Sequence, residues 1–336
     1  MQLLGLTFKE LAVITNNLGM PSYTSFQIMD WLYKKRVYSV DEMTNISLKW
    51  REVLKENCTV GRINHSLVNN SIDGTRKYLF PVSDNKFVET VFIPEKERAT
   101  ICISSQVGCK MNCLFCMTGK QKFAAQLSSS EIINQILSLP ECDELTNYVF
   151  MGMGEPLDNL NELFKTLEIM TANYGLALSP RRITVSTVGI LPELKQLIEK
   201  TSCHIAISLH SPYHEERLSL VPVEKVFPAV RIIELIKKYD FTHQRRISFE
   251  YILFGGLNDD RKHAIDLAHL LSGIPCRVNL IKYHQIPGVN LPETKEEKMI
   301  PFRDYLSSRG IISTIRTSRG EDILAACGML ITDGKI

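Results

Sequence analysis

The sequence predicts an α/β fold: a partial (β/α) barrel preceded by a small N-terminal helical accessory domain and a β-hairpin. Apolar residues recur at helical spacing over residues 1–57. Two β-rich runs then flank a polar turn. Beyond residue 98, apolar strands alternate with helical stretches, as in βαβ units with a parallel sheet. We therefore divide the chain into residues 1–60, the helical accessory domain; 61–97, the β-hairpin linker; and 98–336, the partial-barrel domain.

Each region is assigned from its own spacing. Helices are expected at 8–18, 25–35 and 48–56, and the hairpin strands at 77–80 and 87–93. Barrel strands are expected at 100–104, 148–151, 183–186, 205–208, 248–253, 278–283 and 312–316. The helices between them are expected near 129–138, 160–173, 191–200, 226–239, 260–272 and 296–308. In such folds the chemistry lies at the carboxyl ends of the strands.

Composition narrows the class of protein. A chain of 336 residues can form one large α/β domain and a smaller one. The net charge of +2 does not indicate a nucleic-acid binder, so any basic surface must be local. No apolar run approaches the roughly 20 residues that span a bilayer, and the N-terminal stretch lacks the basic start of a secretory signal. Nine cysteines, an odd number, favour the reducing cytoplasm, with some thiols serving metal or redox chemistry.

Three cysteines carry the strongest chemical signal. They are spaced x3 and x2 in the loop after the first barrel strand: Cys109, Cys113 and Cys116. Three thiolates can hold three irons of a [4Fe–4S] cluster and leave the fourth iron open to a ligand, which permits catalysis. A structural zinc site with an unidentified fourth ligand, or three unconnected thiols, are the alternatives.

Further polar motifs follow later strands. Gly154 and Glu155 follow the second barrel strand, Ser186 ends the third, and Ser208-Leu209-His210 ends the fourth. Glycine lets the backbone approach a ligand closely, and a carboxylate can accept an ammonium group. Each residue alone is more often structural, but their joint position at strand ends favours a cofactor site.

The cysteine spacing, with Phe115 before the last cysteine, resembles that of the radical S-adenosylmethionine superfamily. Longer strings extend the likeness over nearly the whole chain: 88–94, 150–157, 208–212 and 319–328, together with Cys102 and Cys327. They resemble the dual-specificity ribosomal and transfer RNA adenine-C2 methyltransferases. The resemblance implies a partial barrel of the radical SAM type and a [4Fe–4S] cluster on the three cysteines. It also implies S-adenosyl-L-methionine bound by Gly154, Glu155, Ser186, Ser208, Leu209, His210 and His284.

The resemblance also implies a mechanism that uses two S-adenosyl-L-methionine molecules per turnover. One methylates Cys327, and the second gives an adenosyl radical that takes a hydrogen atom from the S-methyl group. The carbon radical adds to C2 of adenine, an electron-poor carbon, and Cys102 releases the product by forming a disulfide with Cys327. Glu89 is the implied proton acceptor; its alternative is a solvent-facing glutamate on the hairpin. The alternative for Cys327 is a packed apolar thiol.

Four positions depart from the family pattern. His284 stands where many relatives have an asparagine that contacts the cofactor, although histidine can also donate or accept a hydrogen bond. Met329 replaces a glutamine near Cys327, and Met117 and Lys122 differ from the usual residues beside the cluster. None of these departures removes a catalytic atom.

The implied substrates are an adenine in the peptidyl-transferase region of 23S rRNA and one beside the tRNA anticodon. Proteins reach such carbons in unstacked, splayed bases. The helical domain and hairpin are expected to grip RNA, helped by local basic sets that are otherwise solvated faces: Lys34-Lys35-Arg36, Lys120 with Lys122, Arg181-Arg182, Arg245-Arg246, and Arg316 with Arg319. An electron donor for the cluster and a disulfide reductant are the other expected partners, with no membrane.

Two other functions are compatible with part of the sequence. The related resistance enzyme that methylates carbon 8 shares the cluster, but Glu155-Pro156 and the string 319–323 look more like the carbon-2 group. A non-catalytic, metal-stabilised RNA-binding module would keep the three cysteines and the basic sets. It would have no need of Cys102, Cys327 or Glu155.

Overall fold

A ten-stranded sheet with strand order β1-β2-β3-β4-β7-β8-β9-β10-β11-β12 runs through the computed structural model, which describes residues 1–241 and 247–332. The strands are β1 Leu67–Asn70, β2 Arg76–Val82, β3 Lys86–Pro94, β4 Ala99–Cys102, β7 Asn147–Phe150, β8 Ile183–Thr187, β9 His204–Ser208, β10 Ile247–Leu253, β11 Cys276–Lys282 and β12 Ile312–Arg316. A separate pair joins β5 Gln106–Val107 to β6 Ala125–Gln126.

The sheet has a parallel part and an antiparallel part. Neighbouring strands from β4 to β12 pair in parallel, whereas β1, β2, β3 and β4 pair antiparallel. Each predicted barrel strand is present, and the order ends openly at β1 and β12 within the described residues. The predicted partial-barrel α/β class is therefore confirmed. The hairpin is continuous with the barrel sheet, because β3 pairs with β4 and covers its edge.

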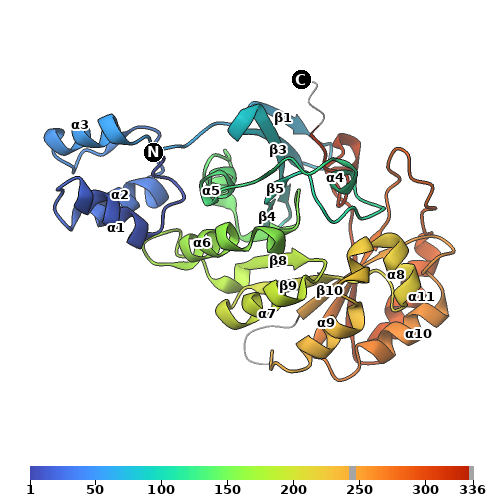
Figure 1. Cartoon of the computed structure of the whole chain (residues 1–336). Helices are drawn as coiled ribbons and strands as arrows, with labels where there is room; N and C mark the ends of the chain where they lie inside the picture. Colours follow the sequence, from blue (N-terminus) through green and yellow to red (C-terminus); the bar gives the residue numbers. More distant parts are fainter. Residues whose placement is uncertain (242–246, 333–336) are drawn as a thin grey trace.

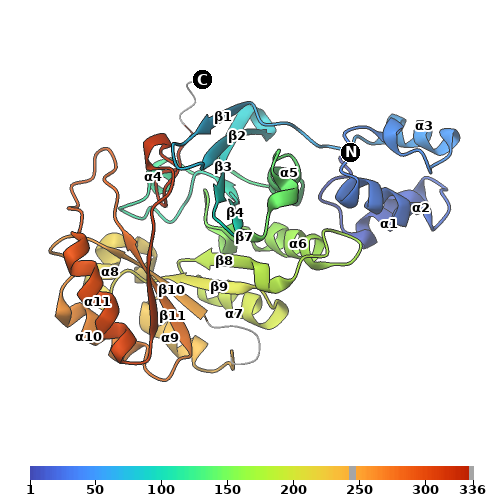
Figure 2. The same ribbon diagram turned by 180° about the vertical axis from the view of Figure 1, so that it is seen from behind.

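Three N-terminal helices precede the sheet: α1 Phe8–Asn17, α2 Thr24–Met29 and α3 Leu48–Asn57. Thr7 and Glu10 form a capping box that starts α1, and α2 continues as a π-helical turn over Asp30–Lys34. Figures 1 and 2 show these helices grouped at one side of the molecule, away from the later helices α8 to α11. Gly5 joins the group to α5, where its carbonyl accepts a bond from Ser129 Oγ (2.8 Å).

The remaining helices cover the parallel strands (Figure 1). The predicted ones are α5 Ser129–Leu137, α6 Leu160–Thr171, α7 Leu191–Lys200, α9 Ala229–Ile236, α10 Arg261–Leu270 and α11 Glu296–Ser308. The sequence did not predict α4 Met117–Lys120 or α8 His214–Leu220. Helix α9 begins three residues later than expected because extended Pro228 precedes it. Among the described residues, no helix is long and apolar enough to cross a membrane.

The apolar helix faces and the sheet form the main core. Ile132, Leu163 and Leu194 are completely buried against it, as are Val185 and Phe249 of the strands. Burying such a side chain contributes about 1.5–3 kcal/mol. Beyond β12, residues 317–332 (the C-terminal segment) return to lie beside α4 and the β1–β3 strands, as both views show (Figures 1 and 2). This return brings Cys327 back to the carboxyl ends of the parallel strands.

Candidate active site

The loop after β4 holds the three clustered cysteines. Gly108 turns this loop with φ +74°, and a Cβ there would lie 2.3 Å from the Lys122 carbonyl oxygen, so only glycine fits. Phe115 packs edge-on against His210, with ring centroids 4.7 Å apart. The loop is therefore anchored by its neighbours on both sides of Cys113.

Burial dominates the chemistry of these thiols. It raises the pKa of Cys109 to about 12 and also raises the pKa of Cys113 and Cys116. Within the described residues, no three thiol, imidazole or carboxylate groups converge as ligands of a single metal ion. A cubane places each thiolate on a different iron, so its ligands need not converge. Three thiols on one loop are the donor set that a [4Fe–4S] cluster with one open iron requires.

The loop after β7 presses against the start of the cysteine loop. Gly154 has φ +99°, and a Cβ there would come within 2.5 Å of the Gln106 side chain. The main-chain N–H of Glu155 donates to Gln106 Oε1 (2.7 Å). The buried carboxylate of Glu155 accepts bonds from the N–H groups of Leu157 (3.2 Å) and Val188 (3.0 Å). Burial raises its pKa to about 7, so near neutrality this group exchanges between its charged and uncharged forms.

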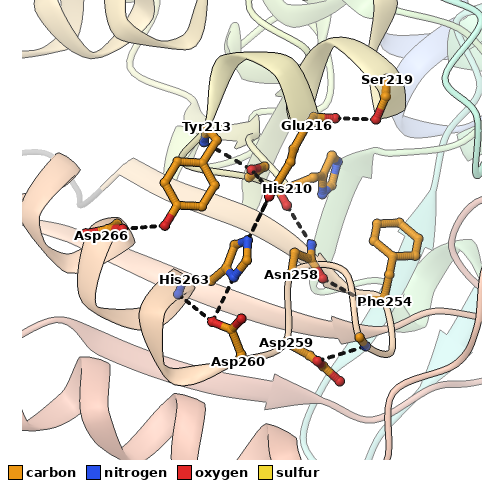
Figure 3. Close-up of polar contacts among 12 residues, drawn as sticks. His210, Tyr213, Glu216, Ser219, Phe254, Asn258, Asp259, Asp260, His263 and Asp266 are labelled. Atoms are coloured by element: carbon orange, nitrogen blue, oxygen red, sulfur yellow. Dashed lines mark hydrogen bonds and ion pairs between the residues drawn. The ribbon is translucent and has the colours of Figure 1, made fainter.

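The ends of β8 and β9 bring the next predicted residues together. Ser186 and Ser208 are half-buried on these neighbouring strands, and Leu209 and His210 are buried just beyond. His210 has φ +61°, and its Nδ1 accepts a bond from the Ile252 N–H (3.1 Å). Its carbonyl accepts from Asn258 Nδ2 (2.7 Å), a contact drawn in Figure 3. Burial lowers the pKa of His210 to about 3, so the imidazole is neutral.

His284 is buried after β11, and it faces the C-terminal segment. Its Nε2 lies 2.7 Å from Ser318 Oγ, and its Nδ1 lies 3.7 Å from a Glu321 carboxylate oxygen. Both ring nitrogens therefore face residues of this segment, while the side chain also lines the central cavity.

A cavity of about 1360 Å³ contains both of the other predicted thiols. Cys102 ends β4, and Cys327 is exposed in the same cavity, with Cys116, Met151 and Arg316 also lining the space. Burial and, secondly, the nearby Cys327 raise the pKa of Cys102 to about 12. Six cations also line the cavity, some at the amino ends and others at the carboxyl ends of the parallel strands: Lys96, Arg98, Arg181, Arg277, Arg316 and Arg319.

Two elements hold the C-terminal segment in this cavity. On one side, the N–H of Met117, next to Cys116, donates to the carbonyl of Gly328, next to Cys327 (2.7 Å). On the other side, the carboxylate of Asp73, in the turn between β1 and β2, accepts a hydrogen bond from the Gly320 N–H (2.9 Å). Ser71 Oγ in the same turn donates to Asp322 (2.6 Å). The cysteine loop and the hairpin thus fix the position of Cys327.

Glu89 of β3 points toward the same segment. Its side chain is 7% exposed, so the alternative of a solvent-facing hairpin glutamate is wrong. Glu89 forms an ion pair with Lys77 (2.9 Å) and accepts a bond from the Ile331 N–H (3.0 Å). Lys77 lies on the same face because Leu79 is directly opposite Glu89 and Val91 opposite Lys77. Lys77 was not predicted, although its position diagonal to Glu89 in the hairpin could have indicated it.

The basic sets have different environments. Arg316 lines the cavity and lies 3.5 Å from buried Glu250, a residue that was not predicted. Arg181 and Arg319 also line the cavity, whereas Lys34 and Lys35 pair with Asp30 and Arg36 pairs with Asp143. Lys120 and Lys122 are exposed. Arg245-Arg246 lies outside the described residues.

This fold and thiol arrangement define a radical SAM enzyme, and comparison with known proteins supports the class. The model of the radical SAM superfamily matches residues 103–268, and that of the ribosomal RNA large subunit methyltransferase N-terminal domain matches residues 1–60. A crystal structure of a radical SAM methyltransferase from Sphaerobacter thermophilus superposes with a TM-score of 0.93 at 36% identity, covering 98% of this chain and 99% of that one.

Sequence relatives identify the family. A probable dual-specificity RNA methyltransferase RlmN of Parabacteroides distasonis is 59% identical, over 98% of this chain and 96% of its own. The RlmN of Syntrophus aciditrophicus is 41% identical, over 97% and 94%. The chain belongs to the RlmN family of radical SAM RNA methyltransferases. It is therefore an S-adenosylmethionine-dependent RNA methyltransferase, and its superfamily implies the [4Fe–4S] cluster and S-adenosyl-L-methionine.

Proposed function

We propose that this enzyme methylates carbon 2 of an adenine in 23S rRNA and of an adenine beside the tRNA anticodon, through an S-methyl group on Cys327. The observation that carries the proposal is the shared cavity of Cys102 and Cys327, two thiols that the cluster does not need. RNA as the substrate is supported by the relatives, which are named as dual-specificity RNA methyltransferases, and by the ribosomal RNA large subunit methyltransferase model that matches residues 1–60.

Cys327 is the methyl carrier in this scheme. Its exposed sulfur takes the methyl group of one S-adenosyl-L-methionine: the new S–CH₃ bond forms, and the sulfonium leaves as a neutral thioether. Cys109, Cys113 and Cys116 would hold the cluster. When bound, the cluster and a second S-adenosyl-L-methionine would supply the radical that removes a hydrogen atom from this methyl group. Each turnover thus consumes two S-adenosyl-L-methionine molecules.

Cys102 releases the product. After the methylene carbon has joined C2, Glu89 would take the C2 proton, and a one-electron acceptor, for which the oxidised cluster would serve, would take one electron. The Cys102 thiolate then attacks the sulfur of Cys327. The S–S bond forms, the C–S bond breaks, and the carbon takes up a proton to become the methyl group. An external reductant then restores both thiols. Cys102 and Cys327 line the same cavity and are close enough for Cys327 to raise the pKa of Cys102, which supports this role.

Glu89 is the proposed acceptor of the C2 proton. Its burial and its bond to Ile331 hold the carboxylate beside the segment that carries Cys327. Lys77 orients it through the ion pair and also donates to the Leu324 carbonyl (3.4 Å). A positioned carboxylate typically contributes 10²–10⁴-fold to such a proton transfer.

The cofactor contacts are proposed for the residues at the strand ends. Glu155 would accept the ammonium group of S-adenosyl-L-methionine, with Gly154, Ser186, Ser208, Leu209 and His210 around it. His284, which lines the cavity, would provide a further contact. Arg316 and Arg319, at and just beyond the carboxyl end of β12, would contact RNA phosphates. Residues 1–60 would form the accessory RNA-binding domain, joined by 61–97 to the catalytic domain 98–336. We expect the enzyme to act on these RNAs in the cytoplasm.

Product analysis tests the proposal. Anaerobically reconstituted protein is incubated with RNA and S-adenosyl-L-methionine, and the digested nucleosides are separated by chromatography and mass spectrometry against synthetic standards. We expect 2-methyladenosine from an unpaired adenine. Exclusive 8-methyladenosine would instead assign the enzyme to the carbon-8 group, and RNA without methylated adenine would contradict both.

A further inference from the structure

Arg217 of α8 is a buried cation at the ends of two cofactor strands. Its side chain is 0% exposed. The guanidinium Nε donates to the carbonyl of Leu209 (3.0 Å), and Nη2 donates to the carbonyls of Ser208 (3.0 Å) and Val188 (2.8 Å). One planar group therefore binds three main-chain oxygens on the ends of β8 and β9.

The charge of Arg217 is balanced by an equally buried carboxylate. Nη1 contacts Glu224, whose second role is to accept the Ala229 N–H at the start of α9 (2.9 Å). Burying an arginine costs several kcal/mol unless its partner is well placed. The pair thus fixes the guanidinium against a helix terminus, and Arg217 is not free to move with the strand ends.

The same contacts extend to Glu155. The main-chain N–H of Val188 donates to Glu155 (3.0 Å), while the carbonyl of the same residue accepts from Arg217 (2.8 Å). One residue, through its two flanking peptide groups, therefore connects the guanidinium to the carboxylate after β7. Arg217 sets the relative position of three strand ends, at β7, β8 and β9.

We propose that Arg217 is a positioning residue for S-adenosyl-L-methionine binding: its forked guanidinium holds Glu155, Ser208 and Leu209 in the arrangement that receives the cofactor. The inference rests on the proposed contacts of these three residues. It assigns no contact between Arg217 and the cofactor itself. Loss of the fork should weaken cofactor binding while the chain stays folded.

Two variants separate positioning from folding. Arg217→Lys keeps the charge beside Glu224, but an ammonium group lacks the planar fork that serves three carbonyls. Arg217→Met with Glu224→Gln removes both buried charges together, so that neither is left unpaired. The matched control is Arg231→Met with Glu234→Gln. These two residues form an exposed ion pair on α9, with 3.4 Å between the Arg231 Nη1 and Glu234 Oε2 atoms.

The experiment measures the dissociation constant of S-adenosyl-L-methionine by equilibrium dialysis, on anaerobically reconstituted protein without RNA. Iron content and the melting temperature are measured on the same samples. We expect both Arg217 variants to keep their iron and to bind S-adenosyl-L-methionine roughly 10–100-fold more weakly, the range for lost supporting contacts. The control pair should bind like wild type.

Unchanged affinity in Arg217→Lys that has full iron would overturn the inference, whatever the stability of the double variant. Weakened affinity in the control pair to the same degree would overturn it as well, because the effect would not be specific to the buried fork. No RNA is present, so failure of the proposed adenine chemistry would leave this result intact and is distinguishable from it.

Discussion

The two thiols of the cavity differ in their surroundings. Burial raises the pKa of Cys102 to about 12, whereas Cys327 is exposed to the cavity. An accessible thiol suits the proposed role of Cys327, which must contact both S-adenosyl-L-methionine and the adenine of the RNA. A half-buried thiol with a raised pKa suits a group that acts only after the adduct has formed, because it competes poorly for the methyl group.

This difference predicts opposite results for two alanine variants. Cys327→Ala should bind RNA but form neither methylated base nor adduct. Cys102→Ala should accumulate a covalent protein–RNA species, since no second sulfur remains to release the product. Denaturing gel electrophoresis with nuclease treatment detects it. Both variants should keep their iron, and normal turnover of Cys102→Ala without trapped RNA would disprove the two-thiol scheme.

Glu155 gives the cofactor site a pH dependence. Burial raises its pKa to about 7 in the free enzyme, and the proposed bond to the cofactor's ammonium group requires the charged form. As pH falls through 7 the group takes up a proton, so binding is lost on the acid side and retained above it. We expect the affinity for S-adenosyl-L-methionine to fall by up to about tenfold per pH unit below 7.

Equilibrium dialysis between pH 5.5 and 8.5 would measure this dependence. In Glu155→Gln the amide cannot titrate, so the acid-side loss should vanish and binding should be weak throughout. A wild-type profile that is flat over this range would rule out Glu155 as the titrating ligand.

At the scale of elements, the turn between β1 and β2 acts as a clasp for the C-terminal segment. Asp73 accepts the Gly320 N–H and lies 4.0 Å from Arg319. Its loss removes a hydrogen bond to a charged group, worth about 1.5–3 kcal/mol. In Asp73→Ala we expect trypsin to cleave at Arg319 roughly ten times faster or more, with reduced methylation. Mass spectrometry of the fragments reports the cleavage site.

The matched control is Asp304→Ala, which removes an exposed carboxylate that pairs with the neighbouring Arg303 on α11. Its cleavage at Arg319 should equal that of wild type. Equal rates in Asp73→Ala and wild type would show that the segment is held without the turn.

Periodicity predicted the elements well because short apolar strands alternate with amphipathic helices of 8 to 13 residues. The same criterion missed α4 and α8, which have only 4 and 7 residues, too few for a helical repeat to be visible. Arg217 lies in the polar run His214-Glu215-Glu216-Arg217, which indicates an exposed face. Its burial depends on carbonyls of β8 and β9 that only the tertiary structure brings together.

The candidate site was predicted more completely than the contacts that support it. The cysteine spacing and strand-end motifs located the thiols and Glu155, because these lie in contiguous strings. Arg217 and Glu250 were missed, since a buried charge is a property of its partners and has no local sequence signal. Lys77 was missed because only the register of the hairpin indicates it.

At the scale of the whole molecule, the three cysteines of the loop should determine the metal content. Anaerobically purified protein should be brown, with about four irons per chain. Cys109→Ala, Cys113→Ala and Cys116→Ala should each lose the cluster, and Cys203→Ala, a buried cysteine of the core, should keep it. Metal analysis and the visible spectrum report the result; a colourless protein with stoichiometric zinc would refute the cluster.

The bonds from Met117 and Thr118 to the carbonyls of Gly328 and Leu330 have a consequence for biosynthesis. Residues 317–332 follow every strand of the sheet in chain order, so the iron-binding loop leaves the ribosome about two hundred residues before its partners do. A nascent chain that still lacks the C-terminal segment has the cysteine loop but not Cys327. In the proposed scheme, such a chain would be unable to form an adduct with the ribosomal RNA around it until Cys327 has emerged and docked.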